Sequence, residues 1–420
     1  MEVRPGYKLT EVGVIPEQWD AKPLKDISPK QSVGLVINPS TYFDKAGTVP
    51  MLVGSDVGEN TINWGTAKRI TTASNQLLSA SRLRASDLVM VRVGEPGTAA
   101  VIPPEFDGCN CASMMIVRRD SSFDSTWLCF AMNSPLGRSR VASVQYGTAQ
   151  KQFNISDAVD FLYPVPPLPE QRAIAAALSA VDALLGGLDR LIAKKRDLKQ
   201  AAMQQLLTRE IRLPGFLGEW EAKRLGELGR FLKGSGVKKD EARSGDLPCI
   251  RYGEIYTHHD DYVRSFNSWI SREVADKATP LRRGDVLFAG SGETKEEIGK
   301  CVAFVVDVEA YAGGDIVILR PTGANSLFLG YFLNAPAVAS QKASRGQGDA
   351  VVHISASALA SINVSLPSLD EQTAIAAVLS DMDAELSALE ARRAKTRALK
   401  QAMMQELLTG RTRLIPLEDE

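Results

Sequence analysis

An internal repeat constrains this chain more than any other feature of its sequence. Residues 170–176 read EQRAIAA and recur, 201 residues later, as EQTAIAA at 371–377. At the same offset, residues 199–208 (KQAAMQQLLT) recur as residues 400–409 (KQAMMQELLT). Self-similarity at a fixed offset is the sequence signature of a structural unit that is built more than once. The sequence therefore predicts two related halves.

The segments between these matching ends have diverged. We call them the first insert (residues 28–160) and the second insert (residues 229–361). They share only scattered points, such as DLV at 87–89 against DVL at 285–287. An old duplication with drift is one explanation, but uniform drift would not spare the ends while scrambling the middle. We interpret the chain as a shared frame that carries two dissimilar inserts.

The matching ends predict two long helices. Residues 170–208 contain no proline. Apolar residues recur there at alternating steps of four and three, which is the seam of a left-handed coiled coil. About 38 residues at 1.5 Å per residue span roughly 57 Å. We expect the two helices to pack together antiparallel and to hold two globular segments at a fixed distance. The predicted seam consists of Ile174, Leu178, Val181, Leu185, Leu188 and Ile192, and of Ile375, Leu379, Met382, Leu386 and Leu389.

Local features of the two helices give further expectations. Each helix follows a proline-rich stretch, and proline is tolerated only up to the first helical turn. Asp370 is the expected N-cap of the second helix. The Gly186-Gly187 pair should cost the first helix roughly 1 kcal/mol per glycine relative to alanine, or else it allows a close approach or a bend.

Both inserts predict mixed α/β domains. The first insert has β-type runs at 33–37, 48–53, 88–93, 99–102 and 114–117, then helical patches at 125–133 and 136–143. The second has runs at 249–252, 286–289, 301–306 and 315–319, then helical patches at 327–334 and 337–344. Strands first and helices last, without βαβ alternation, indicate the α+β class. We predict a pseudo-twofold chain of four segments: a domain at 1–160, a helix at 161–210, a domain at 211–361, and a helix with a tail at 362–420.

Each insert has two polar, glycine-rich loops. They lie at residues 92–98 and 146–152 in the first insert, and at 289–295 and 345–349 in the second. Glycine lets the backbone approach a ligand closely, and Gln, Lys, Arg and Thr side chains can bond base edges and phosphates. Ordinary turns with solvated side chains remain an alternative. The candidate DNA-contacting residues are Lys30, Arg92, Glu95, Thr98, Thr148, Gln150, Lys151, Ser291, Glu293, Thr294, Lys295, Arg345 and Gln347.

The second loops of the two inserts align less regularly than the helices. Matching Gly147 to Gly346 gives an offset of 199, so that Gln150-Lys151-Gln152 faces Asp349-Ala350-Val351. On this alignment, we expect the second insert to lack equivalent base contacts from that loop.

The sequence offers no catalytic or metal site. The segments at 133–136 and 334–337 faintly resemble an Asn-Pro-Pro-Tyr methyltransferase motif but lack its second proline and its aromatic residue, and we read them as helix breaks. The loop at 289–295 lacks the Gly-Lys-Ser/Thr of a P-loop. We find no S-adenosylmethionine loop and no nuclease cluster. Five irregularly spaced cysteines and three histidines match no metal-ligand pattern.

The sequence also lacks membrane and export signals. No run of roughly 18 apolar residues occurs, and the first residues, MEVRPGYKLT, have no apolar core of a signal peptide. Few and unpaired cysteines fit a reducing compartment. We therefore expect a cytoplasmic protein.

These features together resemble the specificity (S) subunit of type I restriction-modification systems. The resemblance rests on an opening like VGVIPEQW at 12–19, a loop like GTAQKQFNIS at 147–156, and PPLPEQ at 166–171. A long helix then ends in LLT at 206–208, and the series is repeated with a different insert. The resemblance covers nearly the whole chain.

The resemblance implies a function and partners. It implies two target recognition domains that each read one half of a bipartite, asymmetric DNA site, and a coiled-coil pair that sets the unread gap. Two methyltransferase (M) subunits, which bind S-adenosylmethionine and methylate adenine, would dock on the helices, and two restriction (R) subunits could join. The chain itself would be non-catalytic and hold no cofactor. The alternatives are a self-contained methyltransferase-nuclease enzyme, and a coiled-coil scaffold that binds protein or carbohydrate.

The charge balance bears on these hypotheses. Lys and Arg number 49 and Asp and Glu number 50, so the formal net charge is −1. DNA-binding domains are often strongly basic. If this chain binds DNA, specificity must come from local groups, and partner subunits must neutralise many of the phosphates. We expect feeble DNA binding by the isolated chain and tight binding with its M partners.

Overall fold

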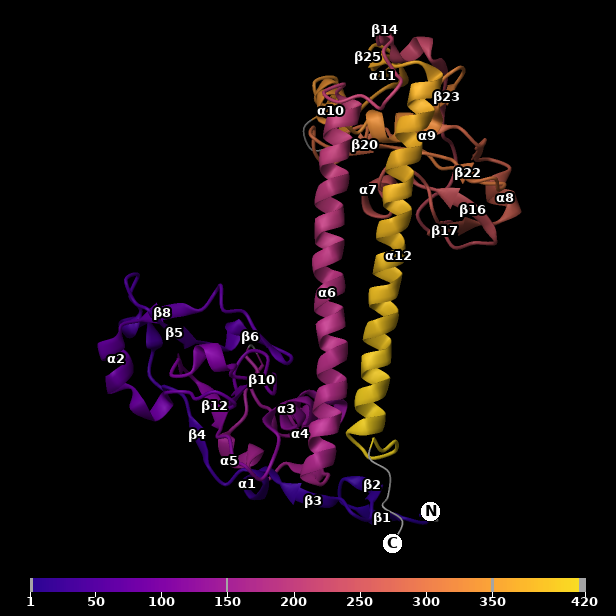
Figure 1. Cartoon of the computed structure of the whole chain (residues 1–420). Helices are drawn as coiled ribbons and strands as arrows, with labels where there is room; N and C mark the ends of the chain where they lie inside the picture. The colour runs from indigo at the N-terminus through magenta and orange to yellow at the C-terminus, as the bar shows by residue number, and fades with distance from the viewer. Residues whose placement is uncertain (1–2, 149, 349–350, 415–420) are drawn as a thin grey trace. The chain divides into compact units, whose positions relative to one another are not determined.

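The computed structural model describes residues 3–148, 150–348 and 351–414. The chain divides into two compact units: Met1–Asp189 with Ala391–Glu420, and Arg190–Glu390. Each unit contains one globular domain and one part of each long helix, because both unit boundaries fall within the helices (Figure 1).

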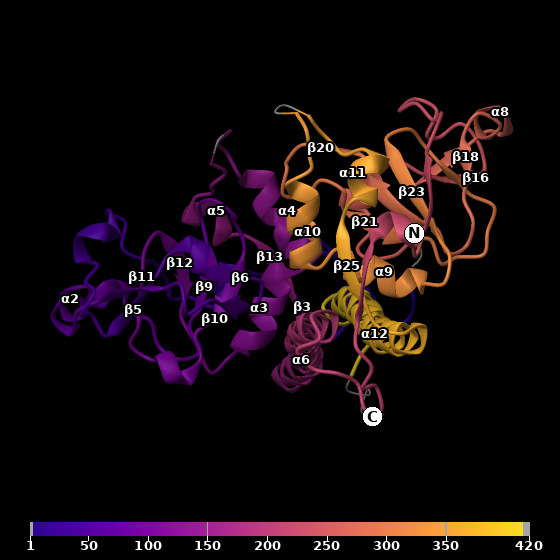
Figure 2. The same cartoon turned by 90° about the horizontal axis from the view of Figure 1, so that it is seen from above.

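The two long helices are α6 (Leu168–Leu207) and α12 (Leu369–Leu407). They lie side by side in both views (Figures 1 and 2). Within the first unit, Arg393 Nη1 lies 3.0 Å from Asp189 Oδ1, and Lys400 pairs with Asp182. Residue numbers therefore rise along α6 as they fall along α12, which confirms the predicted antiparallel pair.

The second unit has the same helix pairing. Lys195 Nζ lies 2.7 Å from Glu385 Oε1, and Lys199 Nζ lies 2.8 Å from Asp383 Oδ1. Lys199 and Asp383 stand 201 residues from Lys400 and Asp182. The same cross-helix ion pair is thus made twice, with the two helices exchanging roles.

The seam residues are all at least partly buried. Val181, Leu185, Met382 and Leu389 are half-buried and the other seven are buried. Ile174 and Leu178 pack into the core of the first unit, and Ile375 and Leu379 pack into the core of the second. The start of each helix is therefore part of a domain core.

One local expectation for the helices is wrong, and one alternative for the glycine pair is excluded at Gly187. Asp370 is not the N-cap of α12, because the helix already begins at Leu369; Ser368 Oγ instead accepts a hydrogen bond from the Glu371 amide at 3.3 Å. The Gly186-Gly187 pair does not serve a close approach at Gly187, where an added Cβ would meet no atom within 4 Å.

The central sheets of the two domains have the same strand order. In the first unit the order is β10 (Ala99–Val101), β9 (Leu88–Val91), β12 (Met114–Val117) and β4 (Gln31–Val33). In the second unit it is β21 (Cys301–Ala303), β19 (Val286–Ala289), β23 (Ile316–Pro321) and β15 (Gly229–Lys233). All neighbours are antiparallel.

A second sheet lies against each central sheet. In the first unit it consists of β11 (Asn110–Cys111), β5 (Val49–Leu52) and β8 (Lys68–Ile70). In the second it consists of β17 (Ser268–Ile270), β16 (Leu247–Ile250), β22 (Tyr311–Ala312) and β18 (Thr279–Pro280). Both contain one parallel pair, β5 with β11 and β16 with β22. Two inserts with little common sequence therefore share the strand order of the central sheet and the parallel pair of the second sheet, to which the second insert adds β18.

Both faces of each central sheet are covered. Leu88 and Met90 of β9 face a core with Trp127 of α3 (Ser125–Asn133). Val89 and Val91 face the other core with Leu52 of β5. Burial on both faces explains why these strands read as continuous apolar runs.

Shorter elements complete the two domains. The remaining strand pairs are β1–β2 (Tyr7–Thr10, Gly13–Pro16), β3–β13 (Asp20–Pro23, Leu162–Val165), β6–β7 (Val57–Gly58, Thr61–Ile62), β14–β25 (Glu221–Arg224, Asn363–Leu366) and β20–β24 (Ser291–Gly292, Val352–His353). The short helices are α1 (Leu24–Ile27), α2 (Thr72–Leu77), α4 (Pro135–Val144), α5 (Ile155–Ala158), α7 (Tyr252–Thr257), α8 (Arg272–Ala275), α9 (Ser326–Phe332), α10 (Pro336–Ala343) and α11 (Ala356–Ala360).

The predicted fold class, two α/β domains with an antiparallel helix pair and pseudo-twofold repetition, is confirmed. The prediction of a strand at 33–37 is wrong, because β4 ends at Val33. Gly34 packs so tightly against Cys111 that a Cβ would lie 2.7 Å from its carbonyl oxygen, and Val36 and Ile37 are exposed. Within the described residues, no helix combines the length and apolar character needed to cross a bilayer.

Candidate nucleic-acid interface

The two glycine-rich loops of the first insert lie side by side. The Gly94 amide donates to the Lys151 carbonyl at 3.1 Å, and Val93 forms an antiparallel bridge with Gln152. Gln152 in turn exchanges backbone hydrogen bonds of 2.9 Å with Tyr146. Three segments, 92–94, 146–148 and 150–153, therefore form one small surface, which we call the first loop pair.

The second insert builds the same arrangement from different residues. Ser291 of β20 pairs with His353 of β24, and His353 exchanges backbone hydrogen bonds of 2.8 and 2.9 Å with Gln347. The Ile354 amide donates to the Gly290 carbonyl at 3.0 Å. We call the segments at 290–292, 347–348 and 351–354 the second loop pair.

These backbone bonds correct the alignment of the two loops. Tyr146 and Gln152 correspond to Gln347 and His353, at an offset of 201, so the expected slip to 199 is wrong. The glycine equivalent to Gly147 is Gly348, not Gly346. Gly147 has φ +94° and Gly348 has φ +106°. An added Cβ would lie 2.3 and 2.2 Å, respectively, from the carbonyl oxygen three residues later.

The corrected alignment changes which residues face each other. Gln152 corresponds to His353 rather than to Val351, and Lys151 corresponds to Val352. The expected partners Asp349 and Ala350 lie outside the described residues. The two loop pairs thus have one backbone geometry and different side chains.

Most of the predicted DNA-contacting side chains lie at the surface. Exposed residues are Lys30, Glu95, Thr148, Gln150, Lys151, Glu293, Thr294, Lys295 and Gln347. Arg92 and Arg345 are half-buried and donate to protein groups: Arg92 Nε to the Phe153 carbonyl at 3.4 Å, and Arg345 Nε to Ser361 Oγ at 3.0 Å.

Three predicted residues stand apart from the others. Thr98 and Ser291 are buried, with 4% and 3% of their surfaces exposed. Lys30 lies beside Arg118, whose amide donates to the Lys30 carbonyl at 3.0 Å. Arg118 directly follows β12, and Arg92 directly follows β9. Because these strands are antiparallel, the two arginines lie at opposite ends of the central sheet. The structure therefore separates Lys30 from the first loop pair by the length of the central sheet.

The structure also shows surface groups that the sequence analysis did not select. His353 is exposed, and its Nδ1 lies 2.8 Å from Ser291 Oγ, so the buried serine orients the exposed imidazole. Tyr146 is 45% exposed, and its hydroxyl donates to Asn154 Oδ1 at 2.9 Å. The corrected offset of 201 is the signal that would have placed His353 opposite Gln152.

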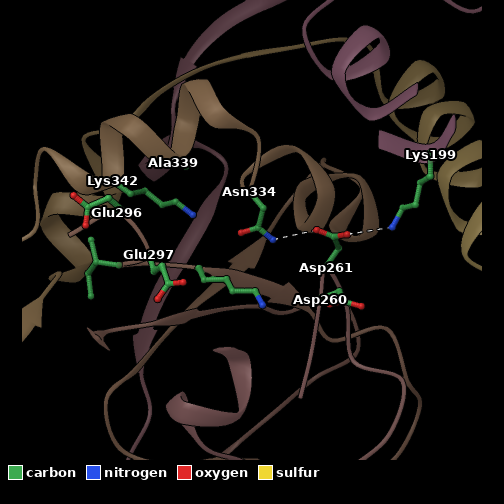
Figure 3. A pocket seen from close by; sticks show the side chains of 10 residues that line it. Lys199, Asp260, Asp261, Glu296, Glu297, Asn334, Ala339 and Lys342 are labelled. Carbon is green, nitrogen blue, oxygen red and sulfur yellow. Dashed lines mark hydrogen bonds and ion pairs between the residues drawn. The ribbon is translucent and has the colours of Figure 1, made fainter. Parts of the chain in front are cut away.

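A charged pocket of about 430 Å³ lies in the second unit between α6 and the domain (Figure 3). Asp261 accepts from Asn334 Nδ2 at 3.3 Å and lies 3.6 Å from Lys199 Nζ. Burial raises the pKa of Asp261, and the Lys199 charge opposes that shift. Lys342 is buried, donates to the Gly299 carbonyl at 2.7 Å, and has its pKa lowered by burial. The contact of Lys199 with Asp261 therefore joins α6 to the domain at this pocket.

The segments that faintly resemble a methyltransferase motif have a structural role. Asn133 accepts from the Ala99 amide at 3.0 Å and donates to its carbonyl at 2.8 Å. Asn334 binds the amide and carbonyl of Cys301 at the same two distances. The expected helix breaks are confirmed, since α3 ends at Asn133 and Asn334 lies between α9 and α10. Among the residues that the structure describes, no group of three or more His, Cys, Asp or Glu could hold a metal ion.

Comparison with known sequences identifies relatives over most of the chain. The family profile described as "Type I restriction modification DNA specificity domain" matches residues 218–397. A putative type I restriction enzyme specificity subunit of Methanocaldococcus jannaschii is 22% identical, over 97% of each chain. A second specificity subunit from that organism is 23% identical, over 60% of this chain and 62% of its own length.

Solved structures share the fold. The S subunit of a type I restriction-modification system from M. genitalium superposes with a TM-score of 0.61 at 14% identity, over 97% of this chain and 98% of that chain. A chain from a structure of a type I R-M system gives a TM-score of 0.57 at 21% identity, over 95% of this chain and 99% of its own. The resemblance seen in the sequence is therefore confirmed.

Proposed function

The chain carries a type I restriction modification DNA specificity domain, and from that premise we propose that it is the non-catalytic DNA-recognition subunit of a type I restriction-modification complex. Each insert forms one target recognition domain, within the segments 1–160 and 211–361. The two domains read different halves of a bipartite, asymmetric DNA site. Catalysis is assigned to partner subunits, which bind S-adenosylmethionine and methylate adenine.

One observation carries this proposal: two domains whose central sheets have the same strand order present different side chains on equivalent loops. Gln152 in the first loop pair stands where His353 stands in the second, and the exposed Lys151 stands where Val352 is buried. Amide side chains pair with adenine, and cationic side chains pair with guanine or phosphate. A common backbone with different donors and acceptors fits two readers of different sequences.

The remaining candidates, of which Arg92 and Arg345 are half-buried, complete the two proposed reading surfaces. Thr98 and Ser291 are left out because they are buried, and Lys30 is left out because it lies at the other end of the central sheet. The surface of the first insert has Arg92, Glu95, Thr148, Gln150 and Lys151; that of the second has Glu293, Thr294, Lys295, Arg345 and Gln347. Ser291 acts indirectly, by holding the imidazole of His353.

The outer faces of the long helices favour helical partners. Leu184, Leu191 and Leu198 recur every seven residues on α6 and are 43%, 39% and 46% exposed. A heptad stripe of this kind packs against another helix in a coiled coil. On α12, Val378 and Leu399 are 36% and 56% exposed. We propose that two methyltransferase subunits dock on these helices in the cytoplasm, and that two restriction subunits can join.

The uninterrupted helices support a role in setting the gap between the half-sites. Inserting four residues at Gly187 and four at Ala388 would lengthen each helix by roughly 6 Å, which is about two base pairs of DNA rise. The recognised gap should grow accordingly, while both half-sites stay the same. An unchanged gap would refute this role of the helices.

An exchange of inserts tests the proposed function. Residues 28–160 are replaced by the first insert of a different specificity subunit, and the methylated sequence is determined with the complete complex. We expect one half-site to change and the other to persist, because each domain reads its own half. A change in both halves would rule out two independent readers. The reciprocal exchange of residues 229–361 is the matched control.

A further inference from the structure

A cluster of cationic side chains lies at the end of the first central sheet that is remote from the first loop pair. It lines a cavity of about 830 Å³ together with two carboxylates, Asp87 and Asp107. The cations are Lys30, Arg82, Arg84, Arg118 and Arg119. They come from three places in the sequence, which the antiparallel pairing of β4, β9 and β12 brings together.

A buried aspartate organises this cluster. Asp87 is 1% exposed and accepts from Arg118 Nη1 at 2.7 Å, from the Arg84 amide at 2.9 Å and from the Arg119 amide at 3.0 Å. The negative charge of Asp87 is therefore balanced inside the protein, by Arg118 and two backbone amides. The side chains of Lys30, Arg84 and Arg119 are exposed, and no ion pair joins them to an acid among the described residues.

The second unit has a related cluster around the equivalent aspartate, in which Pro321 stands in place of Arg119 and Arg283 in place of Ala85. Asp285 is fully buried and accepts from Arg320 Nε and Nη2 at 2.7 and 2.8 Å, and from the Arg282 amide at 2.8 Å. Strand pairing sets Arg230 opposite Arg320, as it sets Lys30 beside Arg118. Arg230, Arg282 and Arg283 are exposed. We call the two sets the first and second basic cluster.

The repetition is informative because the inserts have diverged elsewhere. Lys30 and Arg230 stand 200 residues apart, Arg84 and Arg282 stand 198 apart, and Arg118 and Arg320 stand 202 apart. A simple sequence offset does not align them, yet the fold does. A property kept in both domains serves something that both half-sites share, whatever their base sequences.

We infer that the two basic clusters grip the phosphate backbone of double-stranded DNA, one on each half-site. Phosphate contacts fix the position of a protein on the duplex and carry no sequence information, so both domains can use the same groups. Because the net charge of the chain is close to zero, electrostatic attraction to the DNA phosphates must come from local clusters of cations. This inference rests on the proposed function, because it assumes that both domains bind DNA.

Binding of a mixed-sequence duplex by the full chain at low salt tests the inference without knowledge of the recognised site. The first variant carries Lys30→Gln, Arg84→Gln and Arg119→Gln; the second carries Arg230→Gln, Arg282→Gln and Arg283→Gln. Arg118 and Arg320 are kept because they bind the buried aspartates. We expect each variant to bind more weakly, and the slope of log K against log salt to flatten by about 0.9 for each phosphate that the variant no longer neutralises.

A matched control removes exposed cations of the same domain that lie away from the basic cluster, Lys45→Gln with Lys68→Gln. It should keep the wild-type slope. Unfolding midpoints equal to that of the wild type verify that every variant folds. Wild-type slopes in both cluster variants would overturn the inference, as would loss of partner-subunit binding with an unchanged slope.

The experiment distinguishes a failure of this inference from a failure of the proposed function. The proposed function fails if the wild-type complex shows no preference for any DNA sequence. The phosphate inference fails if the complex prefers its site but the cluster variants keep the wild-type salt slope. If both hold, the variants lose affinity for specific and mixed-sequence DNA alike and keep the ratio between the two.

Discussion

The two units join their domain to the helix pair through equivalent residues with different bonds. In the first unit, Glu170 at the start of α6 accepts from Trp19 Nε1 at 2.9 Å and from two nitrogens of Arg413 at 3.0 and 2.7 Å. In the second unit, Glu371 at the start of α12 binds Arg212 in the same two-pronged way. Trp220 replaces Trp19, but its buried Nε1 has no partner among the described residues.

A second junction differs in charge. Asn133 donates to Asn60 Oδ1 at 2.9 Å in the first unit, where the equivalent Asn334 donates to the carboxylate of Asp261 in the second. Tyr331 donates to Asp383 at 2.6 Å, whereas Phe130 occupies the equivalent place and has no hydroxyl. The two units therefore keep the same backbone arrangement between domain and helices, while the polar side chains at equivalent positions differ. Substitutions that exchange residues between the units test this conclusion.

The largest effect is expected at Glu170. Glu170→Gln removes the charge that Arg413 faces and leaves a partly buried guanidinium without its counter-ion. Breaking a buried ion pair in this way costs about 3 kcal/mol, which urea unfolding of the full chain would measure. Glu371→Gln should cost less, because Glu371 has no tryptophan partner. Glu105→Gln, at an exposed position, is the control, and equal losses at Glu170 and Glu371 would refute the difference.

The next effect concerns the residues that end the two helices. Gly410 and Arg209 both have positive φ, +70° and +64°, but a Cβ on Gly410 would lie 2.4 Å from Pro16 Cδ. Gly410→Ala should therefore cost about 2 kcal/mol, since left-handed backbone alone costs a residue with a Cβ about 1–2 kcal/mol. Urea unfolding of the full chain would measure this loss, and an unchanged stability would contradict the predicted clash.

The reverse exchange should slightly increase the stability of the second unit. Arg209→Gly removes that backbone strain and adds about 0.5–1 kcal/mol of unfolded-chain entropy, so we expect a gain of about 0.5 kcal/mol. Arg209 pairs with Glu219 at an exposed site, and such pairs contribute little. A loss above about 1 kcal/mol would show that Arg209 has another role.

A smaller, pH-dependent effect is expected at Asp261. Burial raises its pKa above 3.8, so the folded state holds this proton more tightly than the unfolded state. The stability that Asp261 contributes is therefore full below pH 3.8 and falls as the pH rises through the raised pKa. Asp261→Asn copies Asn60 and removes this decline. Unfolding free energies measured from about pH 3.5 upward should show the variant gaining on the wild type, and parallel curves would contradict the assignment.

Another small effect compares the middles of the two helices. Gly187 on α6 stands 201 residues before Ala388 on α12, and an added Cβ at Gly187 meets no neighbour. Gly187→Ala should stabilise the chain by up to about 1 kcal/mol, the helix propensity difference. The reverse change, Ala388→Gly, should cost a similar amount. A destabilising Gly187→Ala would indicate that α6 must bend there.

Some of this structure could be predicted from the sequence and some could not. The helices, their seam and most central strands follow from local periodicity, as for the run at 286–289 that forms β19. The pairing of β3 with β13 was missed because Tyr163 to Val165 reads as a proline-rich lead to the helix. The basic clusters were missed because their members meet only through strand pairing. Lys30 was selected, but Arg84 and Arg119 were not.

The loop alignment shows where sequence matching fails. Gly346 and Gly348 are two residues apart, and only the backbone bonds of Gln347 with His353 show that Gly348 matches Gly147. His353 therefore belongs to the second loop pair, a position that the sequence alone did not indicate.

The central claim is that two different domains on one frame read two halves of one DNA site. Mapping methylated adenines in the source genome, with and without this chain, tests it most directly. We predict an asymmetric motif of two short specific parts separated by an unread gap, which loses its methylation when the chain is deleted. Methylation that persists after the deletion, or a lost motif that is palindromic and undivided, would contradict the account.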